Sequence, residues 1–170
     1  QIRELGYCCP EAQKAAFQFA LNHQNEADKF YWAAPLDDCT YLQLSSQDGI
    51  SARPFVMGRI IDPLKVLESI SYPLSARGSV IIEIKDKQVE ANNQKLLLKT
   101  ADTTASIEIL EKSITAHVTI DISALASLVW GRLSVDQLSK QMKSVVGFDH
   151  SLDFLNALFP PCNNWINEHS

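Results

Sequence analysis

The sequence predicts an α+β fold, in which a roughly five-stranded, mainly antiparallel sheet carries helices on one face and follows a smaller αβ unit. The first sign is the alternation of apolar and polar residues, with the period of two typical of strands, at 80–85, 104–109 and 117–122. The second is a series of helical segments with capping residues after the last of these strands. The third is a polar linker at 45–54 that separates the two parts.

The part before the linker is expected to alternate strand and helix twice. Pro10 suits the first position of a helix, because the N–H that proline lacks would be unpaired there anyway. Glu11 adds a favourable negative charge in the first turn. The expected elements are a strand at 2–7, a helix at 10–23, a strand at 29–34 ended by Pro35, and a helix from Asp37 or Asp38 to Leu44.

The polar linker carries Gly49 and Pro54, which interrupt regular structure. It is the best candidate for a domain boundary in the chain. We therefore expect two domains, at 1–54 and at 55–170. The first is small for an independent fold, since about 50 residues bury only a modest fraction of their surface.

The second part begins with an apolar segment, Phe55–Ile61, that we expect to be a strand running into a short helix at 64–70. Asp86 and the pair Asn92-Asn93 supply turn chemistry on either side of a short polar segment. The five expected strands are 55–61, 80–85, 96–98, 104–109 and 117–122.

The helices expected after the last strand are each opened by a capping residue. Ser134 and Gln137 form a capping box, Ser-x-x-Gln, for a helix to about Met142. The other two are a helix at 124–129 capped by Asp121 or Ser123, and a helix at 152–158 capped by Ser151 and stopped by Pro160-Pro161. Trp165-Ile166 is expected to form a short final strand or an extended tail.

Composition and charge restrict the possible functions. The formal net charge is −5, with −3 in residues 1–54 and −2 in residues 55–170, so neither part carries the basic surface of a nucleic-acid-binding protein. A weakly acidic surface suits a cationic amine. No apolar run approaches the roughly 20 residues that span a bilayer, and no signal peptide opens the chain, so we expect a cytoplasmic protein. The first residue is Gln1 rather than Met, which suggests a processed or trimmed chain.

The four cysteines are Cys8, Cys9, Cys39 and Cys162. None forms a Cys-x-x-Cys pair, and the histidines lack zinc-ligand spacing, so no metal site is expected. Free thiols in a reducing compartment are the simplest interpretation. The sequence also lacks the Gly-x-Ser-x-Gly turn of a serine nucleophile, a phosphate-binding Walker loop and a His-Glu-x-x-His motif.

Three stretches carry a resemblance to a known family: Phe55–Pro63, Trp130-Gly131 and the closing 152–166. Together they resemble the C-terminal region of the Eis-like (enhanced intracellular survival) acetyltransferases, which have two acetyltransferase-type domains followed by a sterol-carrier-like domain. The part before residue 55 resembles the C-terminal half of the second acetyltransferase-type domain, although Cys9 stands where the family often has a hydroxyl residue. Its matching residues are Glu4-Leu5, Pro10-Glu11-Ala12, Trp32, Pro35, and Asp37-Asp38 before Leu42 and Leu44.

This resemblance implies an acetyl-CoA-dependent N-acetyltransferase that modifies a primary amine. The partners of this chain would be the N-terminal acetyltransferase domains of the same protein, and family members often form homo-oligomers. Acetyl-CoA binding in this superfamily needs a Gly-rich strand-to-helix turn whose amides hold the pyrophosphate. Only Arg77-Gly78 has a superficial likeness to that turn. We therefore expect the chain alone to bind no cofactor and to transfer no acetyl group.

The resemblance also implies the site residues. In the family, the carboxylate at the C-terminus is thought to act as the general base, which here falls on Ser170, although the family commonly ends on an aromatic residue. Glu168 is a second candidate, for holding the amine. Asp62 is a candidate for the amine pocket, or else it caps the following helix and pairs on the surface with Arg59.

Two other interpretations stay open. Aromatic residues could line an apolar tunnel for a lipid, as in sterol carriers, or they could pack in an ordinary core. They are Trp130, Phe148, Phe154, Phe159 and Trp165. Alternatively, the domain only rigidifies and assembles an enzyme. His117, His150 and His169 are scattered and are interpreted as solvated or paired rather than catalytic.

Overall fold

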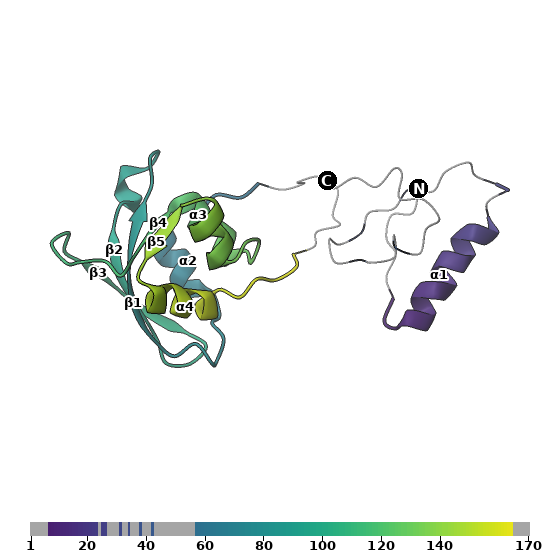
Figure 1. Ribbon diagram of the computed structural model, residues 1–170, viewed down its shortest axis with the longest axis horizontal. Helices are drawn as coiled ribbons and strands as arrows, with labels where there is room; N and C mark the ends of the chain where they lie inside the picture. Colours follow the sequence, from purple (N-terminus) through teal and green to yellow (C-terminus); the bar gives the residue numbers. More distant parts are fainter. Residues whose placement is uncertain are drawn as a thin grey trace. The chain divides into compact units, whose positions relative to one another are not determined.

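The computed structural model describes residues 7–23, 25–26, 31, 34, 38, 42 and 57–164. By its internal contacts the chain divides into two compact units, one of residues 1–55 with 163–170 and one of Val56–Cys162 (Figure 1). The assignment of the two parts to half of an acetyltransferase-type domain and to a sterol-carrier-like domain stays a prediction.

The described helix of the first unit is α1, Pro10–Asn22. It confirms the helix predicted from Pro10, which occupies the first turn together with the acidic Glu11. Cys9 is the N-cap residue and makes no side-chain cap hydrogen bond. The strands expected at 2–7 and 29–34, and the helix expected to end at Leu44, lie outside the described residues except at isolated positions.

The second unit contains a five-stranded sheet with the order β3-β2-β1-β4-β5. Strand β1 pairs in parallel with β4, and the other three pairings are antiparallel. The predicted fold class, a mainly antiparallel five-stranded sheet with helices, is therefore confirmed. The strands are β1 Gly78–Lys85, β2 Lys95–Thr100, β3 Ala105–Leu110, β4 Val118–Asp121 and β5 Val145–Gly147.

One of the five expected strands is wrong. The described part of the 55–61 segment, residues 57–61, has no strand structure, and β5 provides the fifth strand instead. The side chains explain the difference: Ile60 is buried in the core, whereas Met57 and Ile61 are 96% and 69% exposed. A short, mostly apolar run interrupted by Gly58 and Arg59 therefore did not indicate a buried strand. With three residues, β5 is too short to show alternation.

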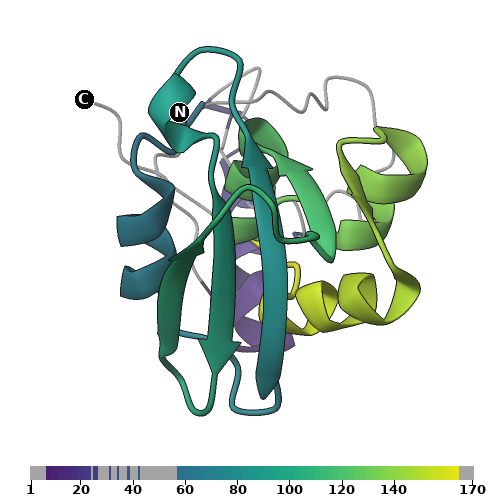
Figure 2. The same cartoon turned by 90° about the vertical axis from the view of Figure 1, so that its left-hand side faces the viewer.

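Helices lie on one face of the sheet (Figure 2). Helix α4 begins at Asp149, earlier than expected, and Ser151 is a buried residue inside it rather than its cap. The capping box does form, but the turn that follows is a π-helix, η3. The elements are α2 Pro63–Ser69, α3 Ile122–Val129, η3 Gln137–Gln141, α4 Asp149–Leu158 and the 3-10 turn η2 Glu90–Asn92.

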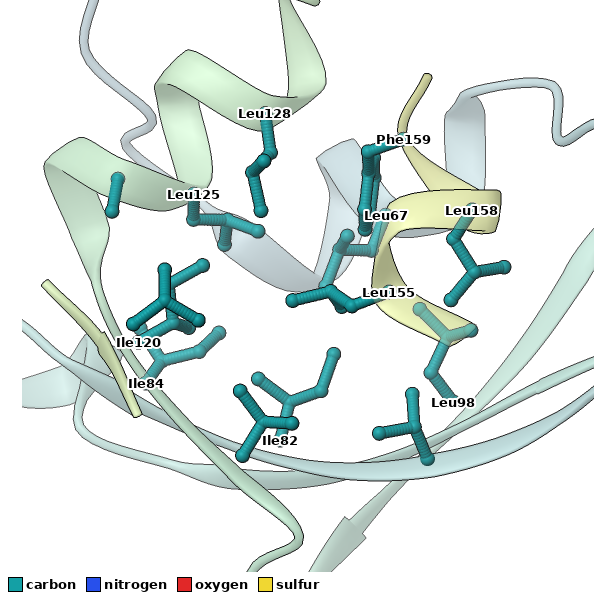
Figure 3. Packing of buried hydrophobic residues seen from close by; sticks show 14 of the residues in the cluster. Leu67, Ile82, Ile84, Leu98, Ile120, Leu125, Leu128, Leu155, Leu158 and Phe159 are labelled. Carbon is teal, nitrogen blue, oxygen red and sulfur yellow. The ribbon is translucent and has the colours of Figure 1, made fainter. Parts of the chain in front are cut away.

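The core lies between the inner face of the sheet and helices α2, α3 and α4 (Figure 3). Alternate residues of β1, Val80, Ile82 and Ile84, are buried there, as the alternation predicts. Leu67 of α2 and Leu155 of α4 point into the same space and are fully buried. The opposite face of the sheet carries the intervening residues, including Glu83, and none of the described helices covers it (Figure 2).

Candidate functional site

The joint before α2 holds the first predicted site residue. Asp62 is the N-cap of α2, and its carboxylate accepts a hydrogen bond of 3.1 Å from the backbone N–H of Lys65. Its second oxygen lies 3.5 Å from the Lys65 ammonium group. The predicted cap is confirmed. The predicted pairing of Asp62 with Arg59 is wrong, because Arg59 reaches a different carboxylate, that of Asp86. A role of Asp62 in an amine pocket stays a prediction.

Asp86 is the centre of the densest polar cluster in the described residues. Its side chain has no exposed surface, and Arg59 Nη2 donates to both carboxylate oxygens at 2.8 and 2.7 Å. The backbone N–H groups of Gln88 and Val89 donate to it at 2.9 and 3.2 Å, and Asn92 Nδ2 donates at 2.9 Å. The cluster ties the segment before α2 to the turn after β1.

The electrostatics of this cluster favour a charged carboxylate. Burial alone would raise the pKa of Asp86, but the hydrogen bonds from Gln88, Asn92, Arg59 and Val89 outweigh it and hold that pKa well below its ordinary value. A carboxylate that is ionised and already accepts five hydrogen bonds has little capacity left to take a proton from a substrate. The arrangement therefore acts as a structural junction rather than as a general base.

Asn93 completes this turn by bridging both backbone groups of Asp86. Its Oδ1 accepts from the Asp86 N–H at 2.9 Å, and its Nδ2 donates to the Asp86 carbonyl at 2.9 Å. The turn residues were predictable from the sequence, but Arg59 was not identified as their partner. Arg59 lies 27 positions from Asp86, and no local pattern links two residues so far apart.

The outer face of the sheet carries a second polar group. Glu83 accepts hydrogen bonds from Lys85 Nζ at 2.8 Å and from Thr119 Oγ1 at 3.2 Å, and the bond from Lys85 lowers the pKa of Glu83. Lys95 Nζ donates to the carbonyls of Lys112 and Ile114, both at 2.6 Å. The two bonds from Lys95 hold the loop between β3 and β4 against β2.

The aromatic residues that could have lined a lipid tunnel lie in different places. Phe159 is buried in the core and meets Tyr72 edge-on, with ring centroids 5.9 Å apart. Phe148 is 55% exposed and stacks on His150, and Phe154 lies against Gly78 at the start of β1. Trp165 lies outside the described residues.

Trp130 and Gly131 form the turn that ends α3. Gly131 has the left-handed φ of 63° that favours glycine, and its N–H donates to the carbonyl of Leu128 while that of Arg132 donates to Ser127. The Trp130 ring lies against the backbone of Gly58. The carbonyl of Gly131 accepts a hydrogen bond of 3.0 Å from the backbone N–H of Cys162. Gly58 and Cys162, which lie near the two ends of the second unit, therefore both contact this turn.

The remaining predicted residues divide between described and undescribed positions. Glu168, Ser170 and His169 lie outside the described residues, and their roles stay predictions. His117 is paired: its Nδ1 accepts from the Ile81 N–H at 3.3 Å. Cys8 and Cys9 are free thiols, as expected.

Two general properties concern the described residues only. Within the described ranges, no three His, Cys, Asp or Glu side chains come together in a way that could hold a metal ion. None of the helices described there has both the length and the apolar character that crossing a bilayer requires.

Comparison with solved structures identifies the fold. A GCN5-related N-acetyltransferase from Anabaena variabilis is 21% identical with a TM-score of 0.74, over 97% of this chain and 42% of that chain. Eis1 from Mycobacterium abscessus is 17% identical with a TM-score of 0.64, over 99% of this chain and 42% of that chain. A probable N-acyltransferase from Enterococcus faecalis is 20% identical with a TM-score of 0.74, over 93% of this chain and 40% of that chain. The chain thus spans about two fifths of the length of these structures, and identities this low show the fold alone.

Sequence comparison identifies the family. No curated protein matches the chain. The family model of the sterol carrier protein domain matches residues 64–167, which is more than half of the chain and includes every helix and strand from β1 to α4. The chain therefore belongs to the sterol carrier protein domain family.

Proposed function

We propose that this chain is the C-terminal region of an acetyl-CoA-dependent N-acetyltransferase that acts on a primary amine. In this proposal the chain itself transfers no acetyl group, and it supports the amine pocket and the assembly of the enzyme into a homo-oligomer. The observation that carries the proposal is the extent of the structural likeness. The likeness to the three structures covers 93–99% of the chain, whereas the match to the sterol carrier domain begins only at residue 64.

Helix N-termini support the assignment of acetyl-CoA to another part of the enzyme. A pyrophosphate binds at a helix N-terminus through free backbone amides and the positive end of the helix dipole. Each α-helix that the structure describes has a carboxylate at its N-terminus, and a carboxylate there would repel a pyrophosphate. These carboxylates belong to Glu11, Asp62, Asp121 and Asp149. The pair Arg77-Gly78 precedes and opens a strand, β1, rather than a helix. This arrangement supports the proposal that acetyl-CoA binds in another part of the enzyme.

The chemistry proposed for this region is proton removal from the amine by the C-terminal carboxylate of Ser170, with Glu168 holding the cationic amine. A carboxylate in a closed pocket can take a proton from an ammonium group when burial raises its pKa. Asp62 would contribute negative charge to the wall of the pocket, since its side chain keeps 44% of its surface exposed while it caps α2.

The test compares this 170-residue chain with the full-length product of its gene. Release of CoA from acetyl-CoA is measured with a panel of primary amines, and the acetylated product is identified by mass spectrometry. We expect activity from the full-length protein and none from the chain alone. In the full-length protein, Glu168→Gln should raise KM for the amine, while the matched exposed change Asp102→Asn should leave both kcat and KM unchanged. Acetyl transfer by this chain alone would contradict the proposal.

The alternative function is the carriage of an apolar ligand, which membership of the sterol carrier family favours. Against it, the described aromatic residues face different parts of the unit, and the inner face of the sheet is filled by buried side chains. Organic extraction of the purified chain followed by mass spectrometry decides between the two functions. A stoichiometric fatty acid or sterol would favour the carrier, and its absence together with acetylation by the full-length protein would favour the enzyme.

A further inference from the structure

The two ends of the sheet-containing unit meet at one turn. The segment before α2 reaches the C-terminal turn of α3 through Gly58, and the segment after α4 reaches it through Cys162. Residues 58 and 162 are more than a hundred positions apart. Gly58 contacts Trp130, and Cys162 contacts both Trp130 and the next residue, Gly131. Both segments lie on the helical side of the sheet (Figure 1).

The contact of the first segment leaves no space for a side chain. A Cβ added to Gly58 would fall onto the six-membered ring of Trp130, within 2.5 Å of Cζ2. The indole ring therefore lies directly on the Gly58 backbone. The backbone of Trp130 is fixed to helix α3, because Trp130 is the C-cap and its backbone N–H donates to the Ala126 carbonyl at 3.0 Å. Any displacement of Gly58 towards the ring must move Trp130 as well.

The contact of the second segment is equally close. A Cβ added to Gly131 would lie 2.7 Å from the backbone nitrogen of Cys162 and 3.2 Å from its Cβ. The Gly131 carbonyl accepts the Cys162 N–H at 3.0 Å, and the Trp130 carbonyl lies 3.7 Å from Cys162 Sγ. Cys162 is thus held by the carbonyls of the two residues that form the turn.

We propose that the Trp130-Gly131 turn is a clasp that couples the segment entering this unit to the segment leaving it. The clasp is defined by Gly58, Trp130, Gly131 and Cys162. Because Trp130 contacts both segments, loosening either one loosens the other, while the sheet and its core stay intact. The proposal goes beyond the proposed function and holds whether or not the full-length protein acetylates amines.

The first experiment changes the segment before α2 at Gly58 and measures the effect on the segment after α4 at Cys162. Hydrogen exchange is followed by NMR on the whole chain for the Cys162 amide, which donates a hydrogen bond of 3.0 Å to the Gly131 carbonyl. We expect Gly58→Ala to speed this exchange about tenfold, while amides in β2 change by less than about twofold, because the opening is local. The double variant Gly58→Ala/Trp130→Leu should exchange no faster than Trp130→Leu alone, since the smaller side chain removes the collision.

The second experiment changes the contact between Gly131 and Cys162 and measures the effect on the chemical shift of Gly58. The ring current of Trp130 should shift the α-protons of Gly58 upfield in the unaltered chain, and Trp130→Leu should abolish that shift. Gly131→Ala, which crowds Cys162, should reduce it. If Gly131→Ala fails to fold, Cys162→Val provides a milder perturbation of the same contact with the same expected result.

A matched control separates coupling from general destabilisation. Gly147 of β5 is also crowded, since a Cβ there would lie 2.7 Å from the His117 carbonyl oxygen and 2.9 Å from Val118 Cγ2. Gly147→Ala should perturb β4 and β5 but leave the Gly58 shift and the Cys162 exchange unchanged. Equal effects of Gly147→Ala and Gly58→Ala on Cys162, or additive effects in the double variant, would overturn the proposal.

Discussion

Asp86 shows how a single carboxylate can join segments that are distant in sequence. Its oxygens accept hydrogen bonds from the turn that follows β1 and from Arg59 before α2, so that one side chain satisfies donors from both places. A buried charge is costly unless it is paired and hydrogen-bonded. The buried charge of Asp86 is therefore stabilised by all of these donors together rather than by any one of them. If the negative charge is lost, Arg59 faces a neutral group.

The Asp86 cluster predicts how stability depends on pH. The folded pKa of Asp86 is lower than the unfolded value of about 3.9, so the unfolded chain binds the proton more readily. The contribution of Asp86 is therefore fully present above about pH 5 and is lost as the pH falls below about 4. Asp86→Asn should lower the urea midpoint at pH 7 and should flatten the decline of stability between pH 5 and pH 3, as measured by urea unfolding at each pH.

An exposed pair provides the control for that experiment. Asp102 lies 3.4 Å from Arg77, and its side chain is 73% exposed. Because water screens such a pair, Asp102→Asn should change the free energy of unfolding by less than about 1 kcal/mol. Equal losses from Asp86→Asn and Asp102→Asn would show that the Asp86 cluster adds no stability beyond that of a surface ion pair.

Single residues were predictable from the sequence where their partners are local. Asp62 could be identified as a cap because Pro63 follows it and the N–H that it accepts lies three residues on. The partner of Arg59 could not be identified, since only the folded sheet brings Asp86 to it. Similarly, the helix predicted at 124–129 gave no sign that the Trp130-Gly131 turn after it meets Gly58 and Cys162.

At the scale of elements, strands were predictable where alternation is long enough to see. Strand β1 has eight residues and buries every second one over most of its length, which the sequence shows directly. Strand β5 has three residues, and its place in the sheet depends on pairing with β4. The capping box correctly placed the start of the turn at Ser134 but could not indicate a π-helix, because hydrogen bonds one residue longer leave no mark on the pattern.

The end of η3 carries an unfavourable backbone conformation that a substitution should relieve. Lys143 follows the C-cap Met142 and has a left-handed φ of 52°, which glycine adopts without the steric cost that a Cβ brings. Lys143→Gly should therefore raise the free energy of unfolding by about 1 kcal/mol, measured by urea denaturation.

Two comparisons test whether the backbone causes that gain. Lys143→Ala removes the same charge but keeps the Cβ, so it should give no comparable gain. Lys140→Gly lies inside η3 and breaks the 2.9 Å ion pair with Asp136, so it should lower the free energy of unfolding. A gain from Lys143→Ala as large as that from Lys143→Gly would assign the effect to charge instead.

At the scale of the whole unit, the fold class followed from the alternation of apolar residues and the sterol carrier domain from a family resemblance, whereas the contact between the two ends of the unit followed from neither. Burial of alternate strand residues and of one face of each helix produces a single core. The core is closed by residues from α2, α3, α4 and the sheet, as Figure 3 shows. Such a core should behave cooperatively, because a cavity at its centre removes contacts from every layer at once.

Leu155 tests this cooperativity. It is fully buried where α4 faces α2 and the sheet, so Leu155→Ala should lower the free energy of unfolding by about 2–5 kcal/mol. The same change at Leu74, which is 62% exposed, should stay within about 0.5 kcal/mol. Hydrogen exchange gives the decisive readout: Leu155→Ala should reduce protection equally in β1, β2 and β4, because these strands open only when the whole core unfolds. Loss of protection in α4 alone would mean that this helix unfolds independently and that the sheet keeps its fold without it.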